Sequence, residues 1–288
     1  MIRSLSALGA CALLAACAAT APDDRRVESN DDRLLRMLAE SMPGEYVSVE
    51  RSGDQSRPTR LLTQVAPGSP GELTVELSQR QSGAPNRDFV LELESTPNPE
   101  RLVGRFMPVL SDSAPRSMVC QMNFVFGPEG LVGETDPGQC RFGERGAAIG
   151  LLKEIVFDGG GFRMADQLLD ADGQPLADPE ILHLRRLARF RGTAARRDGG
   201  ADWRVAGDVQ ILTGLDLVEP LDAAGMSLGF VLNLEWIRPG PSEDTLLRLQ
   251  VLDSDQSEVL AQVWADPEAT MIGLGLDRLR IDLRRDPQ

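Results

Sequence analysis

The stretch Leu73-Thr74-Val75-Glu76-Leu77-Ser78 alternates apolar and polar side chains, and this alternation decides the fold. Successive side chains of a β-strand point to opposite faces, so a period of two indicates a strand with one buried face. The same period recurs at residues 89–94, 228–236, 247–251 and 259–263. Turn signals such as Ala66-Pro67-Gly68 separate these runs. The sequence therefore predicts an all-β protein, an antiparallel barrel or sandwich.

The last apolar run changes its parity once. One set of alternating residues is followed by a second set that is shifted by one position: Ile272, Leu274 and Leu276, then Leu279, Ile281 and Leu283. An extra residue near Asp277-Arg278 would return both sets to one face, because a β-bulge places two residues opposite one. We therefore expect a single strand with a bulge at this point.

A short helix is expected before the strands. Asn30-Asp31-Asp32 can cap it, Leu34, Leu35, Leu38 and Met42 follow at helical spacing, and Pro43-Gly44 ends it. Further on, residues 192–202 are polar and glycine-rich, as in a linker or a long loop. Both flanks are strand-like, so we favour a loop and expect one barrel domain over residues 31–288.

The N-terminus has the features of an export signal. Residues 1–16 contain Arg3 and an apolar run that is too short to span a bilayer, and Leu14-Ala15-Ala16-Cys17 resembles a bacterial lipobox. We expect a signal peptide over 1–16, acylation of Cys17 and a flexible tether over 17–30. Ala18 after the cysteine favours the outer membrane, facing the periplasm. The alternative is a plain secretory signal cut near Ala16 or Ala19.

Charge and residue counts exclude several functions. The formal charge is −14, which argues against a nucleic-acid partner. One histidine, His183, is too few for a two-histidine metal site, so no metal site is expected. The only lysine is Lys153. An arginine-rich segment over 185–197 could meet anionic lipid headgroups or ligand carboxylates, or could be a solvated strand end.

Two cysteines remain after export. Cys11 is lost with the signal and Cys17 is taken by lipid, which leaves Cys120 and Cys140 in an oxidising compartment. A hairpin turn at residues 127–130 would bring the chain back alongside itself, and Pro137-Gly138 would turn Cys140 toward Cys120. We expect a disulfide between them, with free thiols as the alternative.

Several motifs resemble those of one family. The segments Met118 to Phe124, Leu131 to Thr135 and Gly138 to Cys140 resemble the "C-x-M-x-F … F-x-G-x-T … C" stretch of the CpcT/CpeT-type phycobiliprotein chromophore lyases. The opening around Pro43-Gly44-Glu45-Tyr46, the hairpin with Glu76 and Arg87, and the segment from Asp166 to Gly173 are also similar to that family. The resemblance extends to residues 264–276 and so covers nearly the whole mature chain.

The resemblance implies a lipocalin-like antiparallel barrel that holds a linear tetrapyrrole, a bilin, for attachment to a phycobiliprotein cysteine. Such a cavity needs an acid for the pyrrole nitrogens and arginine for the propionates. The matching candidate ligand-binding residues are Tyr46, Glu76, Arg87 and Asp166; no catalytic residue is assigned. Glu76 lies between the apolar residues Val75 and Leu77 in the alternating run, so one of the two faces must lie outside.

Departures from the family pattern keep other functions open. Asn86 replaces the family's tyrosine, and aromatic residues make up only 5% of the chain. An exported lipoprotein would not meet a cytosolic phycobiliprotein. The alternatives to a lyase are an envelope lipoprotein that binds a lipid or other apolar ligand, with an apolar cavity that includes Arg87 and Asp166, and a non-catalytic structural lipoprotein.

Overall fold

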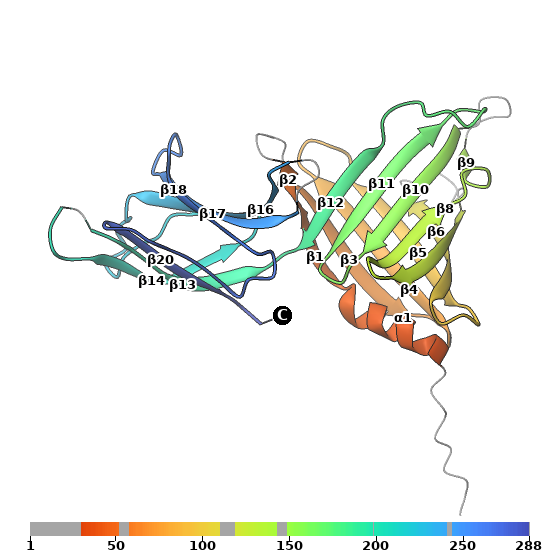
Figure 1. The fold of residues 1–288 in the computed structure, drawn as a ribbon, viewed down its shortest axis with the longest axis horizontal. Helices are drawn as coiled ribbons and strands as arrows, with labels where there is room; N and C mark the ends of the chain where they lie inside the picture. The colour runs from red at the N-terminus through yellow and green to blue at the C-terminus, as the bar shows by residue number, and fades with distance from the viewer. Residues whose placement is uncertain are drawn as a thin grey trace, which may run out of the picture.

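The computed structural model describes residues 30–51, 58–109, 119–142, 149–197, 199–240 and 244–287. These residues form mostly β-strands, with a closed antiparallel barrel and one short helix near the N-terminus, so the predicted fold class is confirmed. Figure 1 shows the barrel beside a second group of strands formed by the C-terminal part of the chain. The expected signal peptide, Cys17 and the tether up to residue 29 lie outside the described residues.

Ten strands of the described chain close the barrel. Their bounds are β1 (Gly44–Ser48), β3 (Thr59–Pro67), β4 (Glu72–Gln81), β5 (Arg87–Ser95), β6 (Arg101–Val109), β7 (Cys120–Gly127), β8 (Gly130–Thr135), β10 (Ile149–Phe157), β11 (Gly161–Leu169) and β12 (Glu180–Arg186). Each strand pairs with the next one along the barrel in antiparallel fashion, and β12 pairs with β1 to close it. The short β9 (Arg141–Phe142) pairs with the start of β10. Closure leaves no long unpaired edge among these described strands.

Helix α1 (Asn30–Ser41) closes one end of the barrel (Figure 1). Leu34, Leu35 and Leu38 are buried in the barrel core, as the helical spacing predicted. The end of the helix is held by the barrel, because Tyr46 and Thr63 each donate a hydroxyl hydrogen bond to the Met42 carbonyl oxygen, at 2.9 and 2.8 Å. We call this end of the barrel the floor and the opposite end the mouth.

The motif segments on β7 and β8 have a packing role. Phe124 lies directly opposite Gly133 in the register of these strands, and a Cβ atom on Gly133 would collide with its ring. A Cβ atom on Gly104 of the neighbouring β6 would lie 2.7 Å from the other side of the same ring. The ring thus covers two glycines, which compensates for their missing side chains.

The predicted disulfide between Cys120 and Cys140 is confirmed. Met122 pairs with Thr135, so simple antiparallel register would place Cys120 opposite residue 137. A turn returns the chain, with the backbone amides of Gln139 and Cys140 both donating to the Asp136 carbonyl oxygen. Both cysteines are buried in the barrel core. The bridge ties the start of β7 to the turn that follows β8.

The strands after residue 187 do not join the barrel. They are β13 (Arg189–Arg196), β14 (Arg204–Leu212), β15 (Leu217–Val218), β16 (Phe230–Arg238), β17 (Leu246–Asp253), β18 (Val259–Ala265), β19 (Met271–Gly275) and β20 (Leu279–Arg285). One sheet has the order β14-β13-β20-β19 and the other β15-β16-β17-β18. Both contribute to a second core, separate from the barrel core, which includes Phe190, Leu234 and Ile281. We call this unit the sandwich.

The sandwich changes three details of the sequence interpretation. The barrel covers residues 44–186 and not the whole of 31–288. Residues 192–196 belong to β13 and are not a loop, so the glycine-rich segment is only the turn between β13 and β14. The expected bulge near Asp277-Arg278 is instead a hairpin turn between β19 and β20, in which Leu276 and Leu279 exchange backbone hydrogen bonds. Reversal of the chain, like a bulge, brings Ile272 and Leu274 into the same core as the second apolar set, whereas Leu276 at the turn is 49% exposed.

The two units are joined without a linker. β2 (Glu50–Arg51) leaves the barrel and pairs in parallel with β16 of the sandwich. Val47 of barrel strand β1 is fully buried in the sandwich core. This continuous packing explains why no change of composition marks the boundary near Leu187. Nowhere in the described ranges is there a helix with the length and apolar character that crossing a membrane requires.

Candidate functional site

The candidate site is the mouth half of the barrel interior, centred on Lys153. Lys153 lies on β10 directly opposite Asp166 on β11, and its ammonium donates a hydrogen bond to Asp166 Oδ1 at 2.6 Å. The lysine side chain is 2% exposed, whereas that of Asp166 is 31% exposed. Water therefore reaches the Asp166 carboxylate, whereas the Lys153 ammonium is shielded from water. A buried lysine requires such compensation, because desolvation disfavours its charged form.

Two aromatic rings lie on the other side of the ammonium. Its nitrogen is 5.2 Å from the ring centroid of Phe89 and 5.0 Å from that of Phe106. These rings come from β5 and β6, which are separated from β10 by β7 and β8, so the lysine side chain reaches across the lumen. The rings are stacked on each other at 5.2 Å. The ammonium lies over both rings, where the negative face of the aromatic quadrupole attracts a cation.

The backbone at Lys153 is fixed by Thr135. The Thr135 hydroxyl accepts a hydrogen bond from the Lys153 backbone amide and donates one to the Leu151 carbonyl oxygen, both at 2.8 Å. The pairing of β8 with β10 extends only to Glu134, so this buried side chain replaces the next backbone bonds of the ladder. Lys153 is therefore held by a rigid wall, and its position does not depend on a loop.

A second charged pair lies at the rim of the mouth. Arg87 at the start of β5 and Glu180 at the start of β12 approach to 3.4 Å. In barrel order three strands, β1, β3 and β4, stand between them, so the pair crosses the rim. Both side chains are more than half exposed. Such a pair contributes little to stability, in the range of about 0–1 kcal/mol, and can open at small cost.

The four predicted ligand-binding residues lie in three different places. Arg87 and Asp166 both lie in the mouth half, on the same strand faces as Phe89 and Met164, which pack in the barrel core. Glu76 is exposed on the outer face of β4, so it is separated from the interior. Tyr46 is buried at the opposite end, beside α1.

Tyr46 has a structural environment. Its hydroxyl accepts a hydrogen bond from Arg186 at 2.6 Å and donates one to Met42. The Arg186 guanidinium also donates to the backbone carbonyl oxygens of Pro43 and Ser41. Burial raises the pKa of Tyr46 to about 12, against the opposing effect of the Arg186 charge. These contacts fasten α1 to the barrel floor.

Aromatic side chains fill the floor half of the barrel. Tyr46 and Phe124 are among the largest fully buried side chains, and Phe157 and Phe162 are in contact, with centroids 4.8 Å apart. This half of the interior is therefore filled by side chains. The inward phenylalanines were missed because Phe106, Phe157 and Phe162 lie outside the clearest alternating runs.

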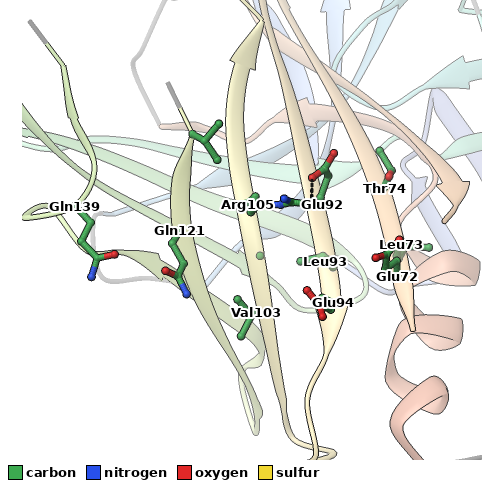
Figure 2. Close-up of a pocket in the computed structure, with 12 residues that line it drawn as sticks. Glu72, Leu73, Thr74, Glu92, Leu93, Glu94, Val103, Arg105, Gln121 and Gln139 are labelled. Carbon is green, nitrogen blue, oxygen red and sulfur yellow. Dashed lines mark ion pairs between the residues drawn. The ribbon is translucent and has the colours of Figure 1, made fainter. Parts of the chain in front are cut away.

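A separate groove of about 490 Å³ lies on the outer face of the barrel, across β4, β5, β6 and β7 (Figure 2). Its lining includes Glu72, Glu92 and Glu94, and Arg105 pairs with Glu92 at 2.7 Å. The groove is open and mainly acidic. Its polar side chains do not converge on a single ligand position.

Lys153 is the residue that the sequence interpretation missed. Its signal was present, since it is the only lysine of the chain and lies within an apolar run.

In the described ranges, no group of three or more histidine, cysteine, aspartate or glutamate side chains is arranged to hold a metal ion.

No family model matches the chain, and no curated protein is similar enough to count as a relative.

Proposed function

We propose that the barrel binds an elongated apolar ligand that carries a carboxylate, in the mouth half of its interior. The observation that carries this proposal is the buried Lys153 ammonium, which lies between Asp166 and the rings of Phe89 and Phe106. An ammonium has three hydrogen-bond donors, and the contact with Asp166 uses one. A ligand carboxylate can accept from a second donor in a site from which most water is excluded.

The surrounding groups fit the rest of such a ligand. Phe89 is partly buried and offers apolar surface beside the charge, stacked on the buried ring of Phe106, and Leu168 is 41% exposed on the same strand as Asp166. Arg87 at the rim can leave Glu180 and bind a second carboxylate bidentately. Asp166 can accept a hydrogen bond from a ring nitrogen or a hydroxyl. A linear tetrapyrrole has two propionates and pyrrole nitrogens, so it is the first candidate ligand, and a fatty acid is the second.

A role in carrying the ligand explains these side chains better than a lyase reaction does. Binding requires only the charges and apolar surfaces named above, whereas attachment of a bilin also requires a partner cysteine brought to the mouth. The motif resemblance to the CpcT/CpeT-type lyases supports a common origin of the barrel. We therefore propose a carrier related to those lyases, without assigning it the lyase reaction.

We also propose that the carrier is anchored to the outer membrane through Cys17 and faces the periplasm. The lipobox-like segment and the disulfide, which is typical of oxidising compartments, support this location. Acyl chains contribute about 0.8 kcal/mol per buried methylene, so a multiply acylated cysteine holds a protein firmly. Cys17→Ser should move the protein out of the detergent phase or leave it unprocessed; unchanged partitioning would exclude the anchor.

The ligand proposal is tested by titrating biliverdin and palmitate against the protein. Biliverdin binding is followed by its induced circular dichroism, and palmitate by its displacement of biliverdin or by calorimetry. Lys153→Met keeps an unbranched side chain but removes the charge, and should weaken binding by roughly tenfold, as expected for loss of a charge-assisted hydrogen bond. Glu76→Gln, on the outer face of the same barrel, is the control and should bind as wild type does. Absence of saturable binding of either ligand to wild type would refute the proposal.

A further inference from the structure

The outer face of the β14-β13-β20-β19 sheet is rich in arginine, although the chain as a whole has a formal charge of −14. We propose that this face docks on the anionic headgroups of a phospholipid membrane. The inference is independent of the barrel ligand. The proposed lipid anchor serves only to orient the molecule, and the experiment below uses a protein that lacks the anchor.

The strand register gathers the arginines on one face. Phe190, Ile281 and Leu283 are buried in the sandwich core, so the residues that alternate with them point outward. The outward arginines of β13 and β20, together with Arg197 just beyond β13, are Arg189, Arg191, Arg197, Arg280 and Arg284. Arg191 lies directly opposite Arg284, and Ala195 lies opposite Arg280. The side chains therefore form one cluster across two paired strands.

Clustered arginines of this kind lower the stability of the sheet. Like charges directly opposite each other on paired strands are destabilising. Among the described residues, the outward carboxylates on β14 and β20 and just after β20 are Asp208, Asp282 and Asp286, which are fewer than the five arginines; Asp202 and Asp277 lie in the turns at the sheet's end. Asp286 pairs with Arg191 at 3.1 Å. The excess of positive charge is a local property of this face, opposite in sign to the chain.

An aromatic ring orders part of the cluster. The guanidinium of Arg197 lies 5.3 Å from the ring centroid of Trp203, and that of Arg280 lies 4.7 Å from it. Stacking of this kind holds an arginine side chain extended and leaves its donors available at the edge. The result is a fixed pair of guanidiniums on a flat surface, suited to phosphate oxygens.

Apolar side chains accompany the charges. Val205 and Met271 are exposed by 46% and 53%, and each lies on the outward side of its strand beside an arginine-bearing strand. Met271 is directly opposite Arg284. Arginine, tryptophan and exposed apolar residues on one surface are the combination that binds at a membrane interface, where headgroups and the upper acyl region meet.

The position of the sheet agrees with an anchored chain. In Figure 1, β13, β14 and β20 form the lower layer of the sandwich, and α1 closes the lower end of the barrel. The arginine face and the helix that follows the proposed tether thus lie on one side of the molecule. At physiological ionic strength, exposed charges more than about 8 Å apart are largely screened from each other. A membrane in contact with this face is therefore attracted by the nearby arginines more than it is repelled by the net negative charge of the chain.

The experiment measures flotation of the full chain carrying Cys17→Ser with lipid vesicles. One set of vesicles is pure phosphatidylcholine, and the other contains one third phosphatidylglycerol. The test variant combines Arg191→Gln, Arg280→Gln and Arg284→Gln. The control variant combines Arg80→Gln, Arg101→Gln and Arg105→Gln, which removes the same charge from the outer surface of the barrel. The ratio of binding between the two vesicle types cancels any contribution from the apolar N-terminal segment.

We expect preferential binding of the starting protein to the anionic vesicles, and its loss at high salt. The test variant should lose that preference by roughly tenfold or more, since several basic residues near a membrane act together, whereas the control should retain it. Equal loss in both variants, no preference in the starting protein, or binding to soluble polyphosphate without binding to vesicles would each overturn the inference. Lys153→Met should leave vesicle binding unchanged, so failure of this inference is distinguishable from failure of the ligand proposal.

Discussion

Replacement of Lys153 by methionine should destabilise the barrel even in the absence of ligand. The change removes the ammonium that lies 2.6 Å from Asp166 and 5.0 Å from the centroid of Phe106, and leaves a carboxylate without its cation. Loss of one partner of a fully buried pair costs about 3–5 kcal/mol. Because Asp166 is 31% exposed, solvent offsets part of that cost, and we expect about 2 kcal/mol. Methionine keeps favourable contact with the two rings.

The assay must report on the barrel. All three tryptophans, Trp203, Trp236 and Trp264, lie in the sandwich, so their fluorescence follows that unit. Urea unfolding is therefore followed in parallel by tryptophan fluorescence and by the absorbance of Tyr46, the only tyrosine. Asp166→Asn and the double variant complete a cycle, in which the coupling between the two sites should be about 1–3 kcal/mol. A change below about 0.5 kcal/mol in Lys153→Met, with no coupling, would show that the ion pair does not stabilise the barrel.

Three further predictions concern the two units separately. Tyr46 should ionise near pH 12 in the native protein and near pH 10 in denaturant, as measured by phenolate absorbance. Its contribution to the free energy of unfolding is therefore lost as the pH rises through this range. Ionisation of the native protein near pH 10 would contradict the burial of Tyr46. Hydrogen bonding from Arg204 lowers the pKa of Asp222, so Asp222→Asn should unfold at a lower urea concentration than wild type at pH 7. The difference in unfolding midpoint should vanish as the pH falls well below about 3.9, because Asp222 is then protonated. A midpoint difference that persists in acid would refute this role of Asp222. Gly133→Ala should cost about 1–3 kcal/mol in urea unfolding, because the new methyl group meets the ring of Phe124, and a neutral result would contradict this packing.

Much of the fold could be predicted from the sequence. The period of two identified the strand-rich class because each barrel strand buries one face only, as β4 does with Leu73, Val75 and Leu77. The helix was predictable from its spacing, and the disulfide from the hairpin between residues 127 and 130. These features depend on local pattern, which the sequence displays directly.

Other features depend on contacts between distant segments. The division into barrel and sandwich is set by which strands pair, and Val47 shows how one strand can contribute to both cores. The final hairpin has the same change of parity as a bulge, so periodicity alone does not distinguish them. At the site, Arg87 and Asp166 were predicted to point inward. The pairing of Asp166 with Lys153 follows from the register of β10 and β11, which the sequence does not specify.

The most direct test of ligand binding at the mouth is native mass spectrometry of the protein purified from its own envelope. Wild-type protein and the Lys153→Met variant are compared under conditions that keep non-covalent complexes intact. The account predicts a bound small molecule on wild type, identified by fragmentation as an apolar carboxylic acid, and its depletion by roughly tenfold from the variant. Detection of the same adduct on both proteins at equal occupancy, or of the unliganded mass alone after titration with biliverdin and palmitate, would contradict it.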